Sequence, residues 1–289
     1  MRRLLLCLAV LAASAGMLLA EPLVLEQADP VLAPKTVEVG LSEIDYNYDK
    51  AIITDSSGNT VTTLTNTALI VPAFARYAVN SKLECKAAIP YSSLSNKSEP
   101  ASGTATTTTD AGMADPTIGA KYKIYEGMCK ISAAADINVP LGQKSTKIAS
   151  AFLNGWNIKP GILASKEWKK LRWNLNVTYN YKGEYTDENS TKQKPGDELA
   201  AGVGAEYDCT KVHGLTFIAE AVYDSLQSAK SAGSTVSGSS GARMDGIIGA
   251  RWNKGNIKTK LGLDLSLGDE KYRAYDYKIL AGITYLIKC

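Results

Sequence analysis

The sequence predicts an all-β fold, a transmembrane up-and-down antiparallel β-barrel of about twelve strands, and three observations lead to this class. Segments in which apolar and polar residues alternate recur along the chain with a period of two. The connections between these segments alternate between long and short. After an apolar segment at the start, no run is long enough for a transmembrane helix. Since an exported chain without such a helix can cross a membrane only as a closed barrel, we expect a barrel.

Residues 1–20 have the features of a secretory signal peptide. Arg2 and Arg3 precede the apolar run LLLCLAVLAA, which is followed by small residues, and cleavage could follow Ala15 or Ala20. Residues 21–34 then form a periplasmic N-terminal tail with three prolines, and residues 35–289 form the barrel. The expected location is the bacterial outer membrane.

The alternation is clearest in three segments. In the last one, residues 274–288, the face that includes Ile279, Ile283 and Ile287 is apolar, and the other face carries Lys278 and Thr284. Residues 171–182 and 256–267 alternate in the same way. A strand with one apolar and one polar face also suits a secreted β-sandwich, so this pattern alone leaves both classes open.

Twelve candidate strands are expected, an even number as in single-chain bacterial barrels. They cover residues 35–45, 67–79, 81–91, 115–126, 129–139, 154–166, 168–184, 197–208, 212–225, 242–253, 256–267 and 274–288. Their boundaries carry errors of about two to four residues.

The connections favour the barrel over the sandwich. Long ones are expected at residues 49–66, 92–114, 140–153, 185–196, 227–241 and 268–273, and short ones at 80–81, 127–128, 167, 210–211 and 253–256. Barrels have longer extracellular loops and short periplasmic turns, whereas a sandwich has no reason to keep this order throughout. Both termini should therefore be periplasmic. We expect the threonine-rich run 104–109 and the serine-rich run 231–241 to be mobile loops.

Composition excludes several other classes. The net charge is +3 with one histidine, which fits neither a nucleic-acid-binding surface nor a histidine-built metal site. Catalysis by a serine–histidine pair is also disfavoured, because His213 lies in a short turn. We therefore expect no enzyme activity, no cofactor and no nucleic-acid partner.

Two segments in the first half resemble a known family, the outer-membrane transporters of the meta-pathway of phenol degradation. The matching segments are residues 67–91 and 112–127, with a further similarity at DINVPLG, residues 136–142. The residues that carry it are Pro72, Arg76, Tyr77, Leu83, Glu84, Pro90, Tyr91, Asp115, Thr117, Gly119, Ala120, Lys121 and Tyr122. This resemblance implies passage of small organic solutes, apolar or aromatic ones among them, across the outer membrane. A structural or adhesive barrel without transport is the alternative.

In each alternating strand, the residues of the polar face, here called the polar phase, are predicted to line the lumen. A lysine or arginine that faced lipid at the midplane would cost about 2–4 kcal/mol. The set comprises Arg76, Glu84, Lys86, Lys121, Lys123, Asp136, Lys159, Arg172, Glu206, Glu220, Asp245, Arg251, Lys258, Lys260, Asp264 and Lys278. Two readings stay open, a network of salt bridges and an anion-attracting channel wall. Twelve strands leave room for a passage unless the tail at residues 21–34 plugs it.

The expected partners are outer-membrane lipid, a small organic solute and the insertion machinery, which usually reads a C-terminal aromatic residue where this chain has Cys289. Four cysteines remain after removal of the signal peptide, in an oxidising compartment. Cys85 with Cys129 is the expected disulfide, although sequence cannot fix the connectivity.

Overall fold

The computed structural model describes residues 33–54, 57–142, 155–186, 190–209, 212–267 and 275–288; the side chains of residues 42 and 43 are also outside this description. The expected signal peptide, most of the N-terminal tail and Cys289 therefore lie outside the described residues. So do most of the expected connection 140–153 and the whole of 268–273.

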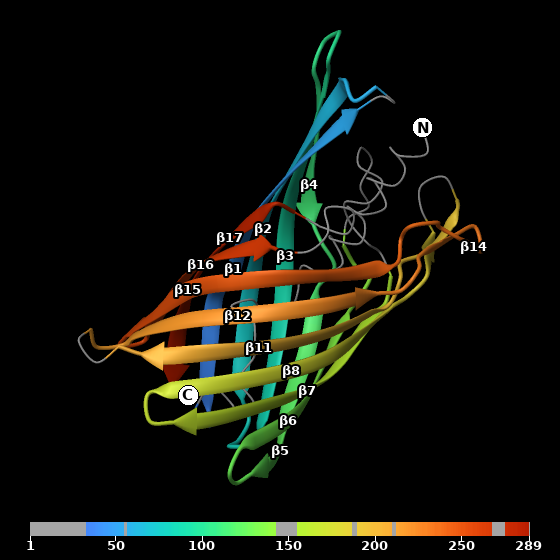
Figure 1. Ribbon diagram of the computed structural model, residues 1–289. Helices are drawn as coiled ribbons and strands as arrows, with labels where there is room; N and C mark the ends of the chain where they lie inside the picture. The colour runs from blue at the N-terminus through green and yellow to red at the C-terminus, as the bar shows by residue number, and fades with distance from the viewer. Residues whose placement is uncertain are drawn as a thin grey trace.

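A single antiparallel sheet closes on itself to form the barrel (Figure 1). Successive strands of the wall pair with each other, except that β4 and β5 both pair with β3, and β1 pairs with β17 to complete the circle. The strands are β1 (Thr36–Thr54), β2 (Thr60–Ala78), β3 (Leu83–Pro100), β4 (Thr106–Met113), β5 (Thr117–Glu126), β6 (Lys130–Asn138), β7 (Asn157–Trp168), β8 (Leu171–Lys182), β11 (Glu198–Asp208), β12 (Leu215–Leu226), β15 (Gly241–Lys254), β16 (Ile257–Ser266) and β17 (Tyr277–Lys288).

The barrel has twelve strand positions in the described part of the chain, because β4 and β5 share one. β4 pairs with the distal part of β3, from Tyr91 to Ser98, and β5 pairs with the proximal part, from Leu83 to Ala88. Residues 114–116 interrupt the strand between them. The Asp115 carboxylate accepts a hydrogen bond from the Gly142 backbone N–H at 2.7 Å, which ties the interruption to the end of β6. The predicted fold class and strand number are confirmed.

Two of the long connections are shorter than predicted. β1 and β2 continue through most of residues 49–66, and β3 with β4 through most of residues 92–114, so that these strands rise above the rest of the wall (Figure 1). Most of the threonine run predicted as a mobile loop, Thr106 to Thr109, is instead part of β4. The error has a physical reason: β-branched threonine favours strands, but a strand beyond the lipid needs no apolar face and so lacks the alternation that was used to find strands.

Two further connections contain short strands. β9 (Tyr185–Thr186), β10 (Lys192–Lys194), β13 (Lys230–Ser231) and β14 (Ser234–Thr235) form a small separate sheet. It joins the β8–β11 and β12–β15 connections outside the barrel wall (Figure 1). The serine-rich run is therefore partly a hairpin rather than a loop.

The barrel has one end with short turns and one end with long connections. The first strand begins and the last strand ends at the end with the short turns. Thr36 at the start of β1 lies opposite Lys288 at the end of β17. Tight turns such as Lys169–Lys170 and Gly255–Asn256 lie at this same end, where one strand ends and the next begins.

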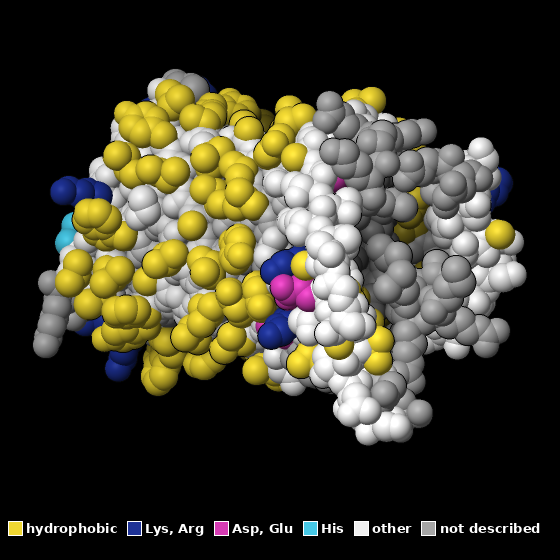
Figure 2. Space-filling view, turned by 90° about the horizontal axis from the view of Figure 1, so that it is seen from above, with side chains coloured by type: hydrophobic (Ala, Val, Ile, Leu, Met, Phe, Trp, Pro, Cys, Tyr) yellow, Lys and Arg dark blue, Asp and Glu magenta, His cyan; other side chains and the backbone are white. Residues whose placement is uncertain are grey.

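The outer face of the wall is apolar. Trp173, Leu175 and Val177 on β8 are about half exposed, whereas the alternate residues Asn174 and Asn176 are buried. The same alternation is found on β15, β16 and β17. Figure 2 shows hydrophobic side chains spread over the outside of the barrel. In a closed single sheet, the buried residues of each alternating pair face the interior.

Candidate functional site

The inner wall carries all sixteen charged residues that the polar phase singled out. Eight are buried and eight are half-buried, and none is exposed. The buried ones are Arg76, Glu84, Lys121, Lys123, Glu206, Glu220, Asp245 and Asp264, and the half-buried ones are Lys86, Asp136, Lys159, Arg172, Arg251, Lys258, Lys260 and Lys278. Most of them are ion-paired with one another across neighbouring strands.

The first group of ion pairs centres on Arg76 of β2. Its guanidinium lies 2.9 Å from Glu38 of β1 and 3.3 Å from Glu84 of β3. The ammonium of Lys121 lies 3.4 Å from Glu84, and that of Lys258 lies 3.3 Å from Glu38. This chain of alternating charges runs along half of the inner wall, from β16 to β5, near the short-turn end.

Beside this group, a glycine in the wall leaves space for an ion pair between two strands that are not neighbours. Lys86 of β3 and Asp136 of β6 are 3.1 Å apart although β5 lies between their strands. The residue of β5 opposite both is Gly119. A Cβ atom at this glycine would lie 2.0 Å from the Asp136 carboxylate, so only glycine lets the pair meet.

The second group centres on Arg243 of β15 near the other end of the barrel. The guanidinium, which is 4% exposed, contacts the carboxylates of Asp224 on β12, Glu198 on β11 at 3.4 Å and Asp245 at 3.7 Å. Lys182 of β8 is fully buried and lies 3.1 Å from Glu198. Four adjacent strands are thus linked through one arginine.

Glu206 of β11 organises a third group. It accepts from Arg172 at 3.0 Å, from Arg251 at 2.7 Å and from the Asn174 amide at 2.8 Å. Because these partners come from β8 and β15, the carboxylate links strands on both sides of its own.

Several inward residues were missed by the sequence reasoning. They include the charged residues Glu38, Asp45, Lys182, Glu198, Asp224 and Arg243, all buried. They also include the buried apolar side chains Ile70, Phe74, Leu163, Ile218, Ile247 and Leu280. Apart from Glu38 and Asp45, all of them occupy the same phase as the predicted lumen residues of their strands, so extending the period-two register could have found them. Glu38 and Asp45 lie on β1, where a register shift after Leu41 breaks the period. The inner wall is a mixture of paired charges and apolar side chains.

The expected disulfide between Cys85 and Cys129 is wrong. Cys85, Cys129 and Cys209, the cysteines in the described residues, are all free. Cys85 of β3 lies opposite Ala120, whereas Cys129 follows the far end of β5. The two are separated by a strand and by about 20 Å along it, far beyond the roughly 7 Å that a disulfide spans between Cα atoms.

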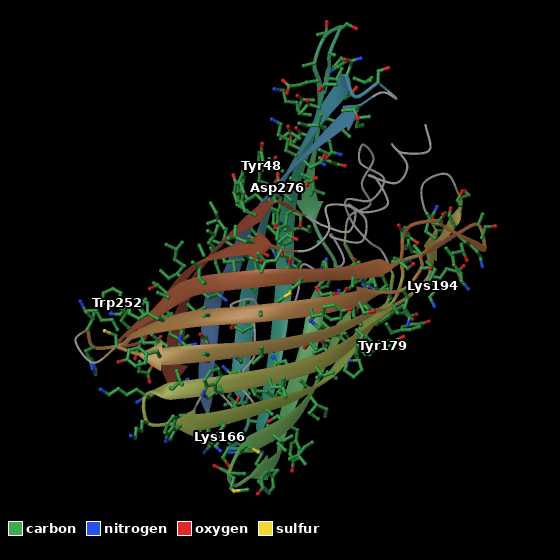
Figure 3. The ribbon with its side chains drawn as sticks, viewed as in Figure 1. Tyr48, Lys166, Tyr179, Lys194, Trp252 and Asp276 are labelled. Atoms are coloured by element: carbon green, nitrogen blue, oxygen red, sulfur yellow. The ribbon has the colours of Figure 1, made fainter. Side chains whose placement is uncertain are left out.

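Aromatic side chains mark both ends of the apolar band. On β8, Trp173 and Tyr181 are eight residues apart, which is about 26 Å of strand. Trp252 at the short-turn end donates to the His213 carbonyl oxygen at 3.3 Å, and Tyr179 at the other end donates to Asp197 at 2.9 Å. Figure 3 shows Trp252 and Tyr179 near opposite ends of the barrel. With barrel strands tilted by about 35–45°, the roughly 26 Å of strand span about 18–21 Å of height, most of an apolar band about 25 Å tall between aromatic girdles.

In the described part of the chain, no group of histidine, cysteine, aspartate and glutamate residues is arranged to hold a metal ion. No helix among these residues is long and apolar enough to span a membrane.

A family model described as "Putative MetA-pathway of phenol degradation" matches residues 49–270, well over half of the chain. The chain belongs to this phenol-degradation family. No curated protein matches the sequence. Among solved structures, it is similar to an outer membrane channel from Pseudomonas putida F1, with 14% identity, a TM-score of 0.70 and coverage of 90% of this chain and 98% of that one.

A second similar structure is the transport unit of the autotransporter AIDA-I from Escherichia coli. Here the identity is 11% and the TM-score 0.51, with 96% of this chain and 97% of that chain covered. At such low identity, both likenesses show the shared outer-membrane barrel fold.

The residues that suggested the phenol-degradation family gather in space. Arg76, Glu84 and Lys121 form the core of the first ion-pair group, and Gly119 makes room for the neighbouring pair. Asp115 anchors Gly142, the last residue of the similar segment 136–142. The family pattern therefore falls on side chains that organise one side of the inner wall.

Proposed function

We propose that this member of the phenol-degradation family is an outer-membrane channel through which small organic solutes cross. The observation that carries the proposal is the chemistry of the inner wall, where paired charges alternate with apolar side chains such as Ile218, Ile247 and Leu280. A wall of this kind offers weak contacts to solutes that have both an apolar body and a polar group. Family membership and the likeness of fold to an outer membrane channel support it.

The dimensions of the barrel are consistent with passage. Eight strands leave an interior that side chains just fill, and twelve positions enclose more space. Part of the wall is lined by small side chains, because Ala134, Gly161, Thr178 and Ala200 follow one another across four strands. Solutes would pass along this part of the wall, where the small side chains leave the most space.

Planar-bilayer recordings of the purified protein would test the proposal, together with solute uptake by cells that lack it. We expect conductance from the wild type and a clear reduction in Ala200→Trp, whose new side chain points inward. The matched control is Leu199→Trp, which places the same ring on the outer face. Absence of conductance, also after deletion of residues 21–34, together with unchanged uptake, would favour a structural or adhesive barrel.

The charge of the wall bears on selectivity. The predicted lumen residues have an excess of bases. The additional buried acids Glu38, Asp45, Glu198 and Asp224 outnumber the additional buried bases Lys182 and Arg243, which reduces this excess by half. We therefore propose at most a modest preference for anionic solutes.

A further inference from the structure

The small sheet outside the wall brings two lysines together at the long-connection end. Lys194 of β10 lies directly opposite Lys230 of β13 in the antiparallel register. Side chains of directly opposed residues point to the same face of a sheet, with Cβ atoms about 4.5–5.5 Å apart. Like charges in this arrangement destabilise the strand pair. The pairing therefore costs free energy unless an anion lies between the two ammonium groups.

The carboxylates on the neighbouring segments already have partners. Glu184 forms an ion pair with Lys192 at 3.3 Å. Asp197 accepts from the Tyr179 hydroxyl at 2.9 Å and from the Lys182 backbone N–H at 3.0 Å. Among the described residues, no carboxylate lies within ion-pair distance of either opposed lysine.

The backbone holds the two lysines in place. The Gln227 N–H donates to the Asp197 carbonyl oxygen at 2.8 Å, and the Ala232 N–H donates to the Lys192 carbonyl oxygen at 2.8 Å. These bonds join the β8–β11 connection to the β12–β15 connection on both sides of the opposed pair. The lysines therefore stay close together despite their repulsion.

The pair lies beside the lipid-facing wall. The Lys194 ammonium is 5.1 Å from the centre of the Tyr181 ring, which belongs to the outward face of β8. Ile158 lies directly opposite Tyr181 on β7, and both side chains are about half exposed, as is Leu199 on β11. Figure 3 shows Lys194 at the same end of the barrel as Tyr179. The positive charge thus lies where the aromatic girdle meets the apolar band.

Two lysines at the short-turn end provide a comparison. Lys254 lies 5.4 Å from the ring centre of Trp252, and Lys169 lies 5.5 Å from that of Trp168. Lys254 is opposite Ile257 in its strand pair, and Lys169 lies in a turn. A cation over an aromatic ring is therefore shared by both ends, and the opposed second lysine distinguishes the Lys194 site.

We propose that Lys194 and Lys230 bind a phosphate group of a glycolipid of the lipid A type, whose acyl chains lie on the apolar wall below them. A phosphate between two ammonium groups accepts charge-assisted hydrogen bonds from both and removes their repulsion. The adjoining apolar wall favours a phosphate that is attached to acyl chains over a free one. The predicted orientation places this end outside, in the leaflet that lipid A forms.

Fluorescence anisotropy of labelled diphosphoryl lipid A, titrated with the purified protein in a zwitterionic detergent, tests the site. Lys194→Gln combined with Lys230→Gln should weaken binding about tenfold or more, because the phosphate loses two charged donors. Lys194→Arg combined with Lys230→Arg keeps both charges and should retain most of the affinity. The matched control is Lys169→Gln combined with Lys254→Gln. It removes the same net charge and the same kind of ring contact, and it should leave the affinity nearly unchanged.

Two further ligands separate phosphate recognition from general affinity for lipid. Dephosphorylated lipid A should bind weakly, and to the same extent in the wild type and in the Lys194→Gln, Lys230→Gln variant. Inorganic phosphate should displace the labelled lipid only at concentrations far above those of unlabelled lipid A, because it lacks acyl chains.

Several results would overturn the proposal. Equal losses in the two glutamine variants would indicate attraction by overall charge, and an unchanged affinity in the Lys194→Gln, Lys230→Gln variant would exclude the site. Displacement by inorganic phosphate at the concentrations of lipid A would indicate a site for free phosphate, and tighter binding of phosphatidylglycerol would contradict the assignment to lipid A. Heat-dependent migration in gels verifies folding, and the single variants replace any double variant that does not fold. Binding in detergent is independent of whether the protein conducts.

Discussion

At the scale of single residues, the position of a charge relative to the wall decides its energetic effect. Outward side chains meet lipid, whereas inward ones meet other charges, so neighbouring residues on one strand differ sharply in what they tolerate. Val177 and Thr178 on β8 form such a pair. Val177 lies midway between Trp173 and Tyr181, and Thr178 faces inward between Gly161 and Ala200.

We therefore expect Val177→Lys to lower the free energy of unfolding by about 2–4 kcal/mol, the cost of lysine at the bilayer midplane. Thr178→Lys should cost much less, because its small neighbours leave space and the lumen is polar. Urea titration of the two variants refolded into lipid vesicles measures the difference. Similar losses would mean that the faces of β8 are reversed.

The buried ion pairs give a second prediction at this scale. Arg243→Met should destabilise the barrel by about 3–5 kcal/mol, because it leaves three carboxylates without their shared cation. Arg251→Met is the matched comparison: its arginine is 26% exposed, and Glu206 keeps Arg172 as a partner. The same lipid titration applies, and equal effects would argue against a structural role for the Arg243 group.

At the scale of elements, the strands that extend beyond the wall contain residues that the sequence pattern assigned to loops. These residues are therefore less accessible to proteases than a loop would be. Thr107 lies in β4 and pairs with Lys97 of β3, so a protease that cuts the serine-rich connection should spare this site. Sequence patterns could not reveal this, because both faces of the segment are polar.

The connections also predict how the barrel is oriented. In a variant without native cysteines, Ser237→Cys should react with a membrane-impermeant maleimide on intact cells, because it is exposed in a turn at the long-connection end. Lys170→Cys in the β7–β8 turn should react only after the outer membrane is permeabilised. Labelling of Lys170→Cys on intact cells would reverse the orientation.

At the scale of the whole molecule, selectivity and stability are linked, because the same side chains serve both. Replacing Lys121, Lys123, Lys258 and Lys260 by Gln should shift the reversal potential in a salt gradient towards cation preference. It should also reduce stability, since Glu84 and Glu38 each lose a partner. A variant in which only Lys123 and Lys260 are changed keeps the Glu84 and Glu38 ion pairs with Lys121 and Lys258. It should therefore be more stable than the fourfold variant. A fourfold variant with unchanged ion preference would show that these lysines do not face the conducting path.

The sequence by itself determined the barrel class, the strand number, the faces of the strands and the inward position of the charged residues. Each of these depends on the period-two alternation that lipid imposes on every spanning strand. The tertiary structure alone decided which charges pair, because Arg76, Glu38 and Lys258 meet only after the register between strands is set and the sheet has closed. It also decided that Cys85 and Cys129 stay apart and that Tyr275 reaches Asp264. Register, closure and the path of a connection depend on contacts between distant segments, and no local pattern encodes them.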